Sequence, residues 1–313
     1  MQSNNRRILI WVAAFTAAVL ALSLSLAAVL SSTGPHRTGA PSPVSATVSA
    51  AASAAAPSAG LITVAHRGAS KRAPENTMAA FRKAVELGAD MIECDVQMSK
   101  DGTLVVIHDT KVNRTTNGRG KVRRLTFRRL RALDAGSWFD TAYRGERIPS
   151  LDELLAAFGG TTGLLIDLKS PRLYPGIEAA VARAVKARGL DRPGQRGVLI
   201  QSTDKRSLKK IKKLMPQIPV AVLIKNPRRV TADRLLEYRT FADALHPKAA
   251  GLTSFFVERA HRYGLKVIAW DAEGKHEISA LLRTGVDGVI TSDPRNIHLP
   301  ADKRGGPASV NLK

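Results

Sequence analysis

One stretch decides the fold expected of this chain: Val64–Asp109, which reads VAHRGASKRAPENTMAAFRKAVELGADMIECDVQMSKDGTLVVIHD. Its short apolar runs end in polar residues that can do chemistry. His66 and Arg67 close one run, His108 closes another, and Glu93 and Asp95 lie at the end of a third. Catalytic residues gather in this way at the C-terminal ends of the strands of a parallel β-barrel. The stretch therefore predicts both a barrel and the end of it that carries the chemistry.

The spacing of Glu93 and Asp95 predicts a cation site. Residues 90–96 form a short run that is apolar at Met91 and Ile92, as expected of a strand. Residues two apart on a strand share a face, so the two carboxylates project together and repel each other unless a cation lies between them. A solvated strand face is the ordinary explanation of such a pair. The neighbouring histidines, and a third run that ends in Asp-x-Lys at residues 167–169, favour the cation.

The pattern of the later chain predicts a (β/α)8 TIM barrel over residues 61–300. Strand-like runs alternate with helical ones, which is typical of parallel strands joined by crossovers. Between Gln97 and Leu155 this alternation is interrupted by a turn at Asp101-Gly102 and a further extended piece, so we expect a small insertion after the second strand. Residues 75–87 are expected to form a helix that Pro74 starts and Gly88 stops. The eight strands are expected near 62–65, 90–95, 163–168, 197–201, 219–223, 242–245, 266–270 and 286–290.

The quoted stretch resembles the signature region of the glycerophosphodiester phosphodiesterase family. The similarity covers roughly residues 62–297 and keeps the expected order, so it is far more specific than a single short motif. Later segments that carry it are RTTNGRGKV from Arg114, LDAGSWF from Leu133, IPSLDELL from Ile148, LLIDLKS from Leu164, LIQSTD from Leu199, VIAWDAEG from Val267 and GVDGVITSDP from Gly285.

The resemblance implies a phosphoric diester hydrolase with two-histidine acid/base catalysis and one divalent cation. His66 and His108 would exchange the protons, since imidazole titrates near neutral pH. Arg67 and Lys169 would add positive charge around the phosphate. The predicted metal ligands are Glu93, Asp95 and Asp167, and ligation by oxygen alone favours Ca²⁺ or Mg²⁺.

Three further residues are predicted to bind or support the substrate, and two positions depart from the family. Glu75 and Asn76 directly follow the His-Arg-Gly motif, with helix capping as the alternative role. Trp270 ends a strand where the family places an aromatic residue against glycerol; a structural tryptophan is the alternative. Asp167 stands where the family usually has glutamate, so it would bind the cation either directly or through water. Asp271 stands where threonine is more usual.

The N-terminal sixty residues are expected to lie outside the barrel. Arg6 and Arg7 precede an uncharged apolar run, Ile8–Leu30, which is long enough to cross a bilayer as a signal anchor or to act as a signal peptide. Both possibilities export the barrel, to the outer face of the cell membrane or as a secreted protein. Residues 31–60 are rich in Ala, Ser and Pro and are expected to be a disordered linker, and residues 301–313 a disordered tail.

The charge of the chain is strongly positive, with 48 Lys and Arg against 26 Asp and Glu and a formal net charge of +22. Such a field attracts anionic partners. No nucleic-acid-binding motif accompanies it, and export would remove that partner, so we expect no nucleic acid. The expected partners are a small glycerophosphodiester, a phospholipid head group or a glycerol-phosphate polymer. A basic surface kept for solubility is the alternative.

The function predicted from these residues is hydrolysis of glycerophosphodiesters to glycerol 3-phosphate and an alcohol. Two alternatives stay open. The barrel could have lost catalysis and only bind anionic head groups at the membrane, or it could be a phosphoinositide-type lyase that forms a cyclic phosphate. The single cysteine, Cys94, excludes an intrachain disulfide and is expected to be a small buried residue.

Overall fold

A computed structural model of the chain describes residues 60–192 and 197–297. The predicted N-terminal segment, nearly all of the predicted linker and the predicted tail lie outside these described residues. Within them, no helix combines the length and the apolar character that crossing a membrane requires.

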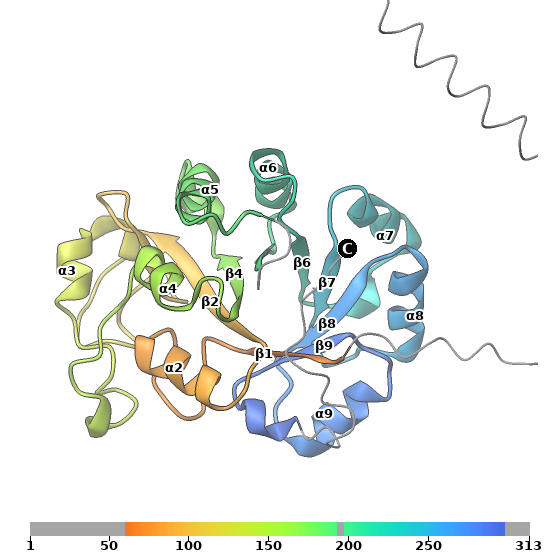
Figure 1. The fold of residues 1–313 in the computed structure, drawn as a ribbon, viewed down its shortest axis with the longest axis horizontal. Coiled ribbons are helices and arrows are strands. Elements are labelled where there is room, and N and C mark those ends of the chain that lie inside the picture. Colours follow the sequence, from red (N-terminus) through yellow and green to blue (C-terminus); the bar gives the residue numbers. More distant parts are fainter. Residues whose placement is uncertain (1–59, 193–196, 298–313) are drawn as a thin grey trace, which may run out of the picture. The chain divides into compact units, whose positions relative to one another are not determined.

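Eight parallel strands form a closed barrel (Figure 1). Strand β1 pairs with both β2 and β9, which joins the two ends of the sheet. This arrangement confirms the predicted barrel, although several strands begin or end one to three residues later than expected. The strands are β1 (Ile62–Ala65), β2 (Met91–Met98), β4 (Gly163–Leu168), β5 (Val198–Ser202), β6 (Val220–Ile224), β7 (Ala244–Pro247), β8 (Lys266–Trp270) and β9 (Gly288–Thr291).

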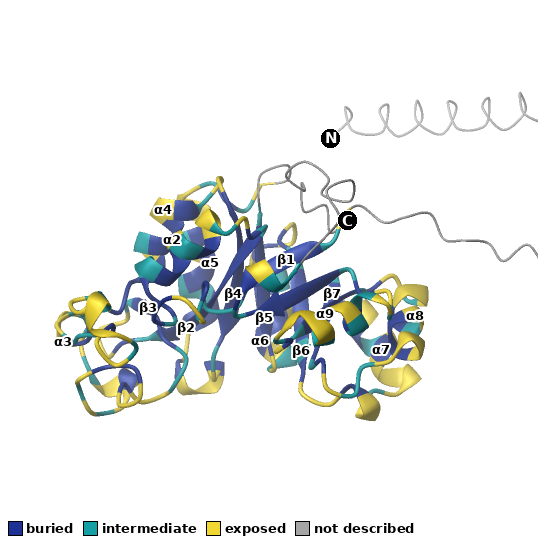
Figure 2. Cartoon of the chain, turned by 90° about the horizontal axis from the view of Figure 1, so that it is seen from below, coloured by how far each residue is buried: buried dark blue, intermediate teal, exposed yellow. Residues whose placement is uncertain are grey.

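Amphipathic helices surround the barrel and bury one face each against the strands (Figure 2). Many begin with a side-chain cap; Ser150 and Glu153, for example, form a reciprocal capping box at the start of α4. The helices that follow barrel strands are α2 (Met78–Glu86), α4 (Leu151–Phe158), α5 (Ile177–Ala187), α6 (Lys205–Leu214), α7 (Ala232–Arg239), α8 (Ser254–Arg262) and α9 (Lys275–Leu282).

The core has two separate apolar layers. The larger layer lies between strands and helices, and it includes Cys94, which is fully buried and free as predicted. The smaller layer fills the barrel lumen as a packed apolar floor. Every barrel strand contributes to this floor: Val64, Met91, Leu165, Leu199, Ala221, Ala244, Ile268 and Ile290.

The insertion after the second barrel strand is present and has a small core of its own. Strand β3 (Leu104–Val106) pairs antiparallel with β2, after a turn in which Gly102 has a φ of +85°. Helix α3 (Phe127–Arg131) lies in the same insertion. Its apolar cluster includes Val112, Val122 and Leu130, all fully buried. The insertion is therefore packed rather than a loose loop.

The helix predicted at 75–87 is shorter than expected at its start. It begins at Met78, with Thr77 as the N-cap, and the chain turns before it. Asn76 has a φ of +58°, which no helical residue adopts. The prediction placed Pro74 at the first turn; in the structure its carbonyl instead accepts a hydrogen bond from the Thr77 hydroxyl. The stop at Gly88 is confirmed, because this residue adopts the left-handed conformation common after a helix.

Candidate active site

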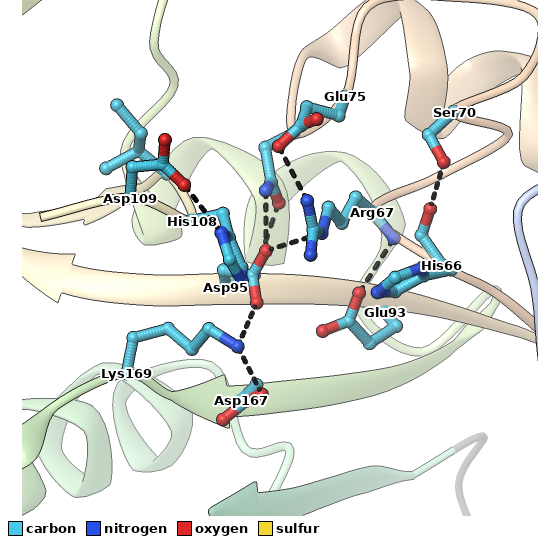
Figure 3. Close-up of polar contacts among 12 residues, drawn as sticks. His66, Arg67, Ser70, Glu75, Glu93, Asp95, His108, Asp109, Asp167 and Lys169 are labelled. Atoms are coloured by element: carbon cyan, nitrogen blue, oxygen red, sulfur yellow. Dashed lines mark hydrogen bonds and ion pairs between the residues drawn. The ribbon is translucent and has the colours of Figure 1, made fainter. Parts of the chain in front are cut away.

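A cavity of about 550 Å³ opens at the carboxyl ends of the barrel strands, above the apolar floor. Its wall brings together both predicted histidines, His66 and His108, with Arg67 and Lys169. These residues come from the ends of β1 and β4 and from the insertion that follows β2. Residues far apart in the chain therefore line one cavity. Figure 3 shows how their side chains lie relative to one another.

Glu93, Asp95 and Asp167 form a buried acidic triad at the base of this cavity. One carboxylate oxygen from each lies within 4.8 Å of the others. The strand spacing places Glu93 and Asp95 on one face, and Asp167 is the direct register partner of Asp95 on the adjacent strand. Burial raises the pKa of Glu93 well above its usual range, and the charge of Asp95 adds to this effect. Burial also raises the pKa of Asp167.

Two cationic side chains partly compensate the triad. Lys169 Nζ lies 3.1 Å from Asp95 Oδ1 and 3.0 Å from Asp167 Oδ2, and Arg67 Nε lies 3.3 Å from Asp95 Oδ2 (Figure 3). Burial alone would raise the pKa of Asp95, but the charges of Lys169 and Arg67 lower it. The Arg67 backbone N–H also donates to Glu93 Oε2 at 2.7 Å.

The triad fits a hard divalent cation. Its donors are all carboxylate oxygens, the ligands that Ca²⁺ and Mg²⁺ prefer. The Asp95 Oδ1 atom is buried and accepts no hydrogen bond, although Lys169 is close to it. Glu93 and Asp167 resist ionisation where they stand, which a bound cation would reverse.

The two histidines have different surroundings. Burial, followed by the charge of Arg67, lowers the pKa of His66 to about 4, so this imidazole is neutral near pH 7. His108 Nδ1 lies 2.7 Å from Asp109 Oδ1. A carboxylate can only accept, so Nδ1 donates and Nε2 is the nitrogen left for another partner.

Glu75 and Asn76 reach the cavity through other residues. The Glu75 carboxylate accepts from Arg67 Nη1 at 2.9 Å, and the Asn76 amide donates to Asp95 Oδ2 at 2.8 Å. Asn76 Oδ1 in turn accepts from the Asp95 backbone N–H. Neither is among the residues that line the cavity. Trp270 does line it, and its indole N–H donates to the Ile224 carbonyl.

Sequence reasoning missed Arg114, which joins the two halves of the site. Its guanidinium forms paired hydrogen bonds with Glu75, at 2.8 Å to each carboxylate oxygen, and also contacts both oxygens of Asp109. The hydrogen bond from Arg114 is the main reason that the pKa of Asp109 falls to about 2. The only available signal was its position at the start of the segment RTTNGRGKV.

Strained backbone is concentrated around the cavity. Among the described residues, the four non-glycine positions with positive φ are Arg67, Asn76, Ser170 and Asp271. Arg67, Ser170 and Asp271 follow the ends of β1, β4 and β8, and Asn76 contacts Asp95. Such conformations cost about 1–3 kcal/mol each and persist where the surrounding structure enforces them.

Comparison with known proteins gives one consistent result. The model of the glycerophosphoryl diester phosphodiesterase family matches residues 66–296. A glycerophosphodiester phosphodiesterase of Caldanaerobacter subterraneus is 40% identical over 238 residues, which cover 75% of this chain and 96% of that protein. One from Bacillus subtilis is 38% identical, covering 76% of this chain and 85% of its own.

Solved structures agree. An Oleispira antarctica phosphodiesterase, determined in complex with the product sn-glycerol-3-phosphate, superposes with a TM-score of 0.70 at 30% identity, covering 76% of this chain and 95% of that one. A glycerophosphodiester phosphodiesterase from Agrobacterium tumefaciens superposes with a TM-score of 0.63, also at 30% identity, over 75% of this chain and 98% of that one. The match over most of the barrel, together with the cavity at its strand ends, shows that this chain belongs to the glycerophosphoryl diester phosphodiesterase family of phosphoric diester hydrolases.

Proposed function

We propose that this protein hydrolyses glycerophosphodiesters to glycerol 3-phosphate and an alcohol, with one Ca²⁺ or Mg²⁺ held by the acidic triad. The observation that carries the proposal is the single cavity shared by His66, His108, Arg67, Lys169 and two of the three acids. The product found in the related Oleispira structure supports the same reaction. The triad supports the cation, because three buried carboxylates within 4.8 Å of one another require compensation.

Arg67 and Lys169 bind the phosphodiester in this proposal. Arg67 has the planar fork that suits two phosphate oxygens, and Glu75 holds it from behind. Lys169 provides a point charge on the opposite side of Asp95. A cation bound by the triad would neutralise charge that develops on the phosphoryl oxygens. Arg67 and Lys169 keep the phosphate oriented while the two histidines transfer protons.

His66 and His108 divide the proton transfers. Near pH 7 the His66 imidazole is neutral and can accept a proton, so we assign it the role of general base. His108 presents Nε2 to the cavity because Asp109 holds Nδ1, and it serves as the general acid toward the leaving alkoxide. Arg114 binds both Asp109 and Glu75. Because Asp109 contacts His108 and Glu75 contacts Arg67, Arg114 keeps His108 and Arg67 at a constant separation.

The test is turnover of glycerophosphocholine with and without a chelator. We expect release of glycerol 3-phosphate that stops with EDTA and returns with Ca²⁺ or Mg²⁺. His66→Ala and His108→Ala should each lower turnover about 10²-fold or more, with far-UV circular dichroism unchanged. No turnover by the metal-loaded wild type would favour a barrel that only binds head groups. A cyclic phosphate in the ³¹P NMR spectrum of the products would favour the lyase.

We also propose that substrates with an anionic alcohol moiety are preferred, including glycerol-phosphate polymers. Lys111 and Lys225 line the cavity, and among the described residues neither makes an ion pair. Arg67 and Lys169 are already close to carboxylates, so the two outer lysines are available to a second negative charge. We expect kcat/KM for polyglycerol phosphate to exceed that for glycerophosphocholine and to fall with added salt. Lys111→Gln with Lys225→Gln should remove the difference; no turnover of the polymer would refute this preference.

We propose that the protein lies outside the cytoplasm, either anchored at the membrane or secreted. This rests on the basic and apolar segment at residues 6–30 and on the Ala-, Ser- and Pro-rich composition of residues 31–60. Protease treatment of intact cells, with separate assay of membrane and medium, tests it. Protein that stays protected from protease and absent from the medium would contradict the proposal.

A further inference from the structure

A chain of buried hydrogen bonds continues from the acidic triad across the barrel lumen. Gln201 Nε2 donates to Asp167 Oδ2 at 3.3 Å, and Gln201 Oε1 lies 2.6 Å from His246 Nδ1. Gln201 is 3% exposed and His246 is fully buried. His246 is not among the residues that line the cavity, and neither residue is in the set that we predict to catalyse, bind metal or bind substrate.

The strand register explains how these three residues meet. Gln201 on β5 is the register partner of Asp167 on β4, so the two side chains leave neighbouring strands on the same face. His246 lies on β7, two strands from Gln201, and alternate strands contribute to one layer of a barrel lumen. The partner of Gln201 on the intervening strand β6 is Ala221, whose methyl group leaves room for the contact.

The donors and acceptors allow only one arrangement of this chain. Asp167 also accepts from Lys169 through the same Oδ2 atom, so the Gln201 amide must turn its NH₂ group toward the carboxylate. Its oxygen then faces His246, which must carry its proton on Nδ1. Burial lowers the pKa of His246 to about 3, which keeps the ring neutral with one N–H. His246 Nε2 is left buried without a hydrogen-bond partner among the described residues.

We propose that Gln201, fixed by His246, is a positioning residue that turns the Asp167 carboxylate so that Oδ1 faces the cation site. Lys169 and Gln201 both occupy Oδ2, which leaves the other oxygen for the cation. An aspartate is one methylene shorter than a glutamate and reaches the site with less freedom, so its orientation matters more. These two polar side chains, buried in the barrel lumen, serve metal affinity in this way. This inference rests on the cation site of the proposed function.

The test is the affinity of the full chain for Ca²⁺ measured by isothermal titration calorimetry. Gln201→Met keeps an unbranched side chain of similar size without hydrogen bonds, and we expect it to weaken Ca²⁺ binding about 10–100-fold, the usual effect of losing a partner of a metal ligand. The matched control is Ser202→Ala. Ser202 is the next residue on β5 and fully buried, and its hydroxyl donates to the Leu168 carbonyl instead of to the triad. We expect its Ca²⁺ affinity to stay within about twofold of the wild type.

A pair of substitutions at His246 tests the second link and does not depend on Gln201→Met folding. Asparagine places an amide N–H where histidine has Nδ1, so His246→Asn should keep most of the affinity. His246→Leu removes the donor and should lose it. Unchanged binding in Gln201→Met and in His246→Leu, or equal losses in the two His246 variants, would overturn the inference. If the wild type bound neither Ca²⁺ nor Mg²⁺, that result would instead refute the proposed metal site.

Discussion

Gly68, in the loop that carries His66 and Arg67, provides a quantitative test of how the site is built. Its φ is +77°, and a methyl group at this position would lie 2.6 Å from the Ala80 carbonyl carbon and 2.8 Å from its Cβ. Gly68→Ala therefore combines two costs. The left-handed conformation costs about 1–2 kcal/mol, and overpacking against helix α2 costs about 1–3 kcal/mol. The sum is about 2–5 kcal/mol, or a fall in Tm of roughly 4–20 °C for a domain of this size.

Gly88 is the matched control because it separates the two costs. Its φ is +75°, nearly the same as that of Gly68, but a methyl group there would meet no atom within 4 Å. Gly88→Ala should therefore lose only about 1–2 kcal/mol, or roughly 2–8 °C. Thermal unfolding followed by circular dichroism measures both variants. Equal falls in Tm would refute the close approach of the loop to α2, since only the shared conformational cost would then remain.

Three further predictions follow from the charged groups. Burial raises the pKa of Glu93, so in the metal-free protein this side chain takes up a proton on folding, and the protein loses stability as the pH rises above 4.5. Glu93→Gln should therefore raise the Tm of the metal-free protein at pH 8 but not at pH 4. The same substitution should reduce the rise in Tm on adding Ca²⁺. The hydrogen bond to Asp287 raises the pKa of His261, so the pair stabilises the fold most below pH 6.5, and this stabilisation is lost as the pH passes the raised pKa. His261→Gln should therefore cost more stability at pH 6 than at pH 9. A cost that does not depend on pH would contradict the pairing. Arg114→Gln should lower kcat/KM about 10–100-fold, the loss expected for charge-assisted hydrogen bonds, while Tm changes little. Wild-type kinetics in this variant would show that Arg114 has no role in the reaction.

The parts of the structure that depend on local periodicity were predictable from sequence. Glu93 and Asp95 share a face because side chains alternate on any strand, and the strand itself was visible as a short apolar run. The turn at Gly102 and the stop at Gly88 were predictable because glycine there permits a left-handed conformation. The closed barrel was expected from eight alternating runs, and β1 does pair with β9.

Contacts between distant segments were not predictable by such rules. Arg114 meets Glu75 from 39 positions away, and the path of the insertion that brings them together is set by its own small core. His246 meets Gln201 across β6 only because of the barrel register. The start of α2 was misplaced because Asn76 turns to contact Asp95, a tertiary interaction that overrides the helix-starting preference of Pro74.

The apolar floor of the lumen has a consequence for how such a protein can change over evolutionary time. On several strands the floor residue and a cavity residue are two positions apart: Val64 precedes His66, Met91 precedes Glu93, Leu165 precedes Asp167, and Ile268 precedes Trp270. The row of floor residues therefore maintains the barrel, and the row of cavity residues above it can be substituted. New reactivity can be acquired by exchanging the upper row while the lower row still holds the cylinder shut.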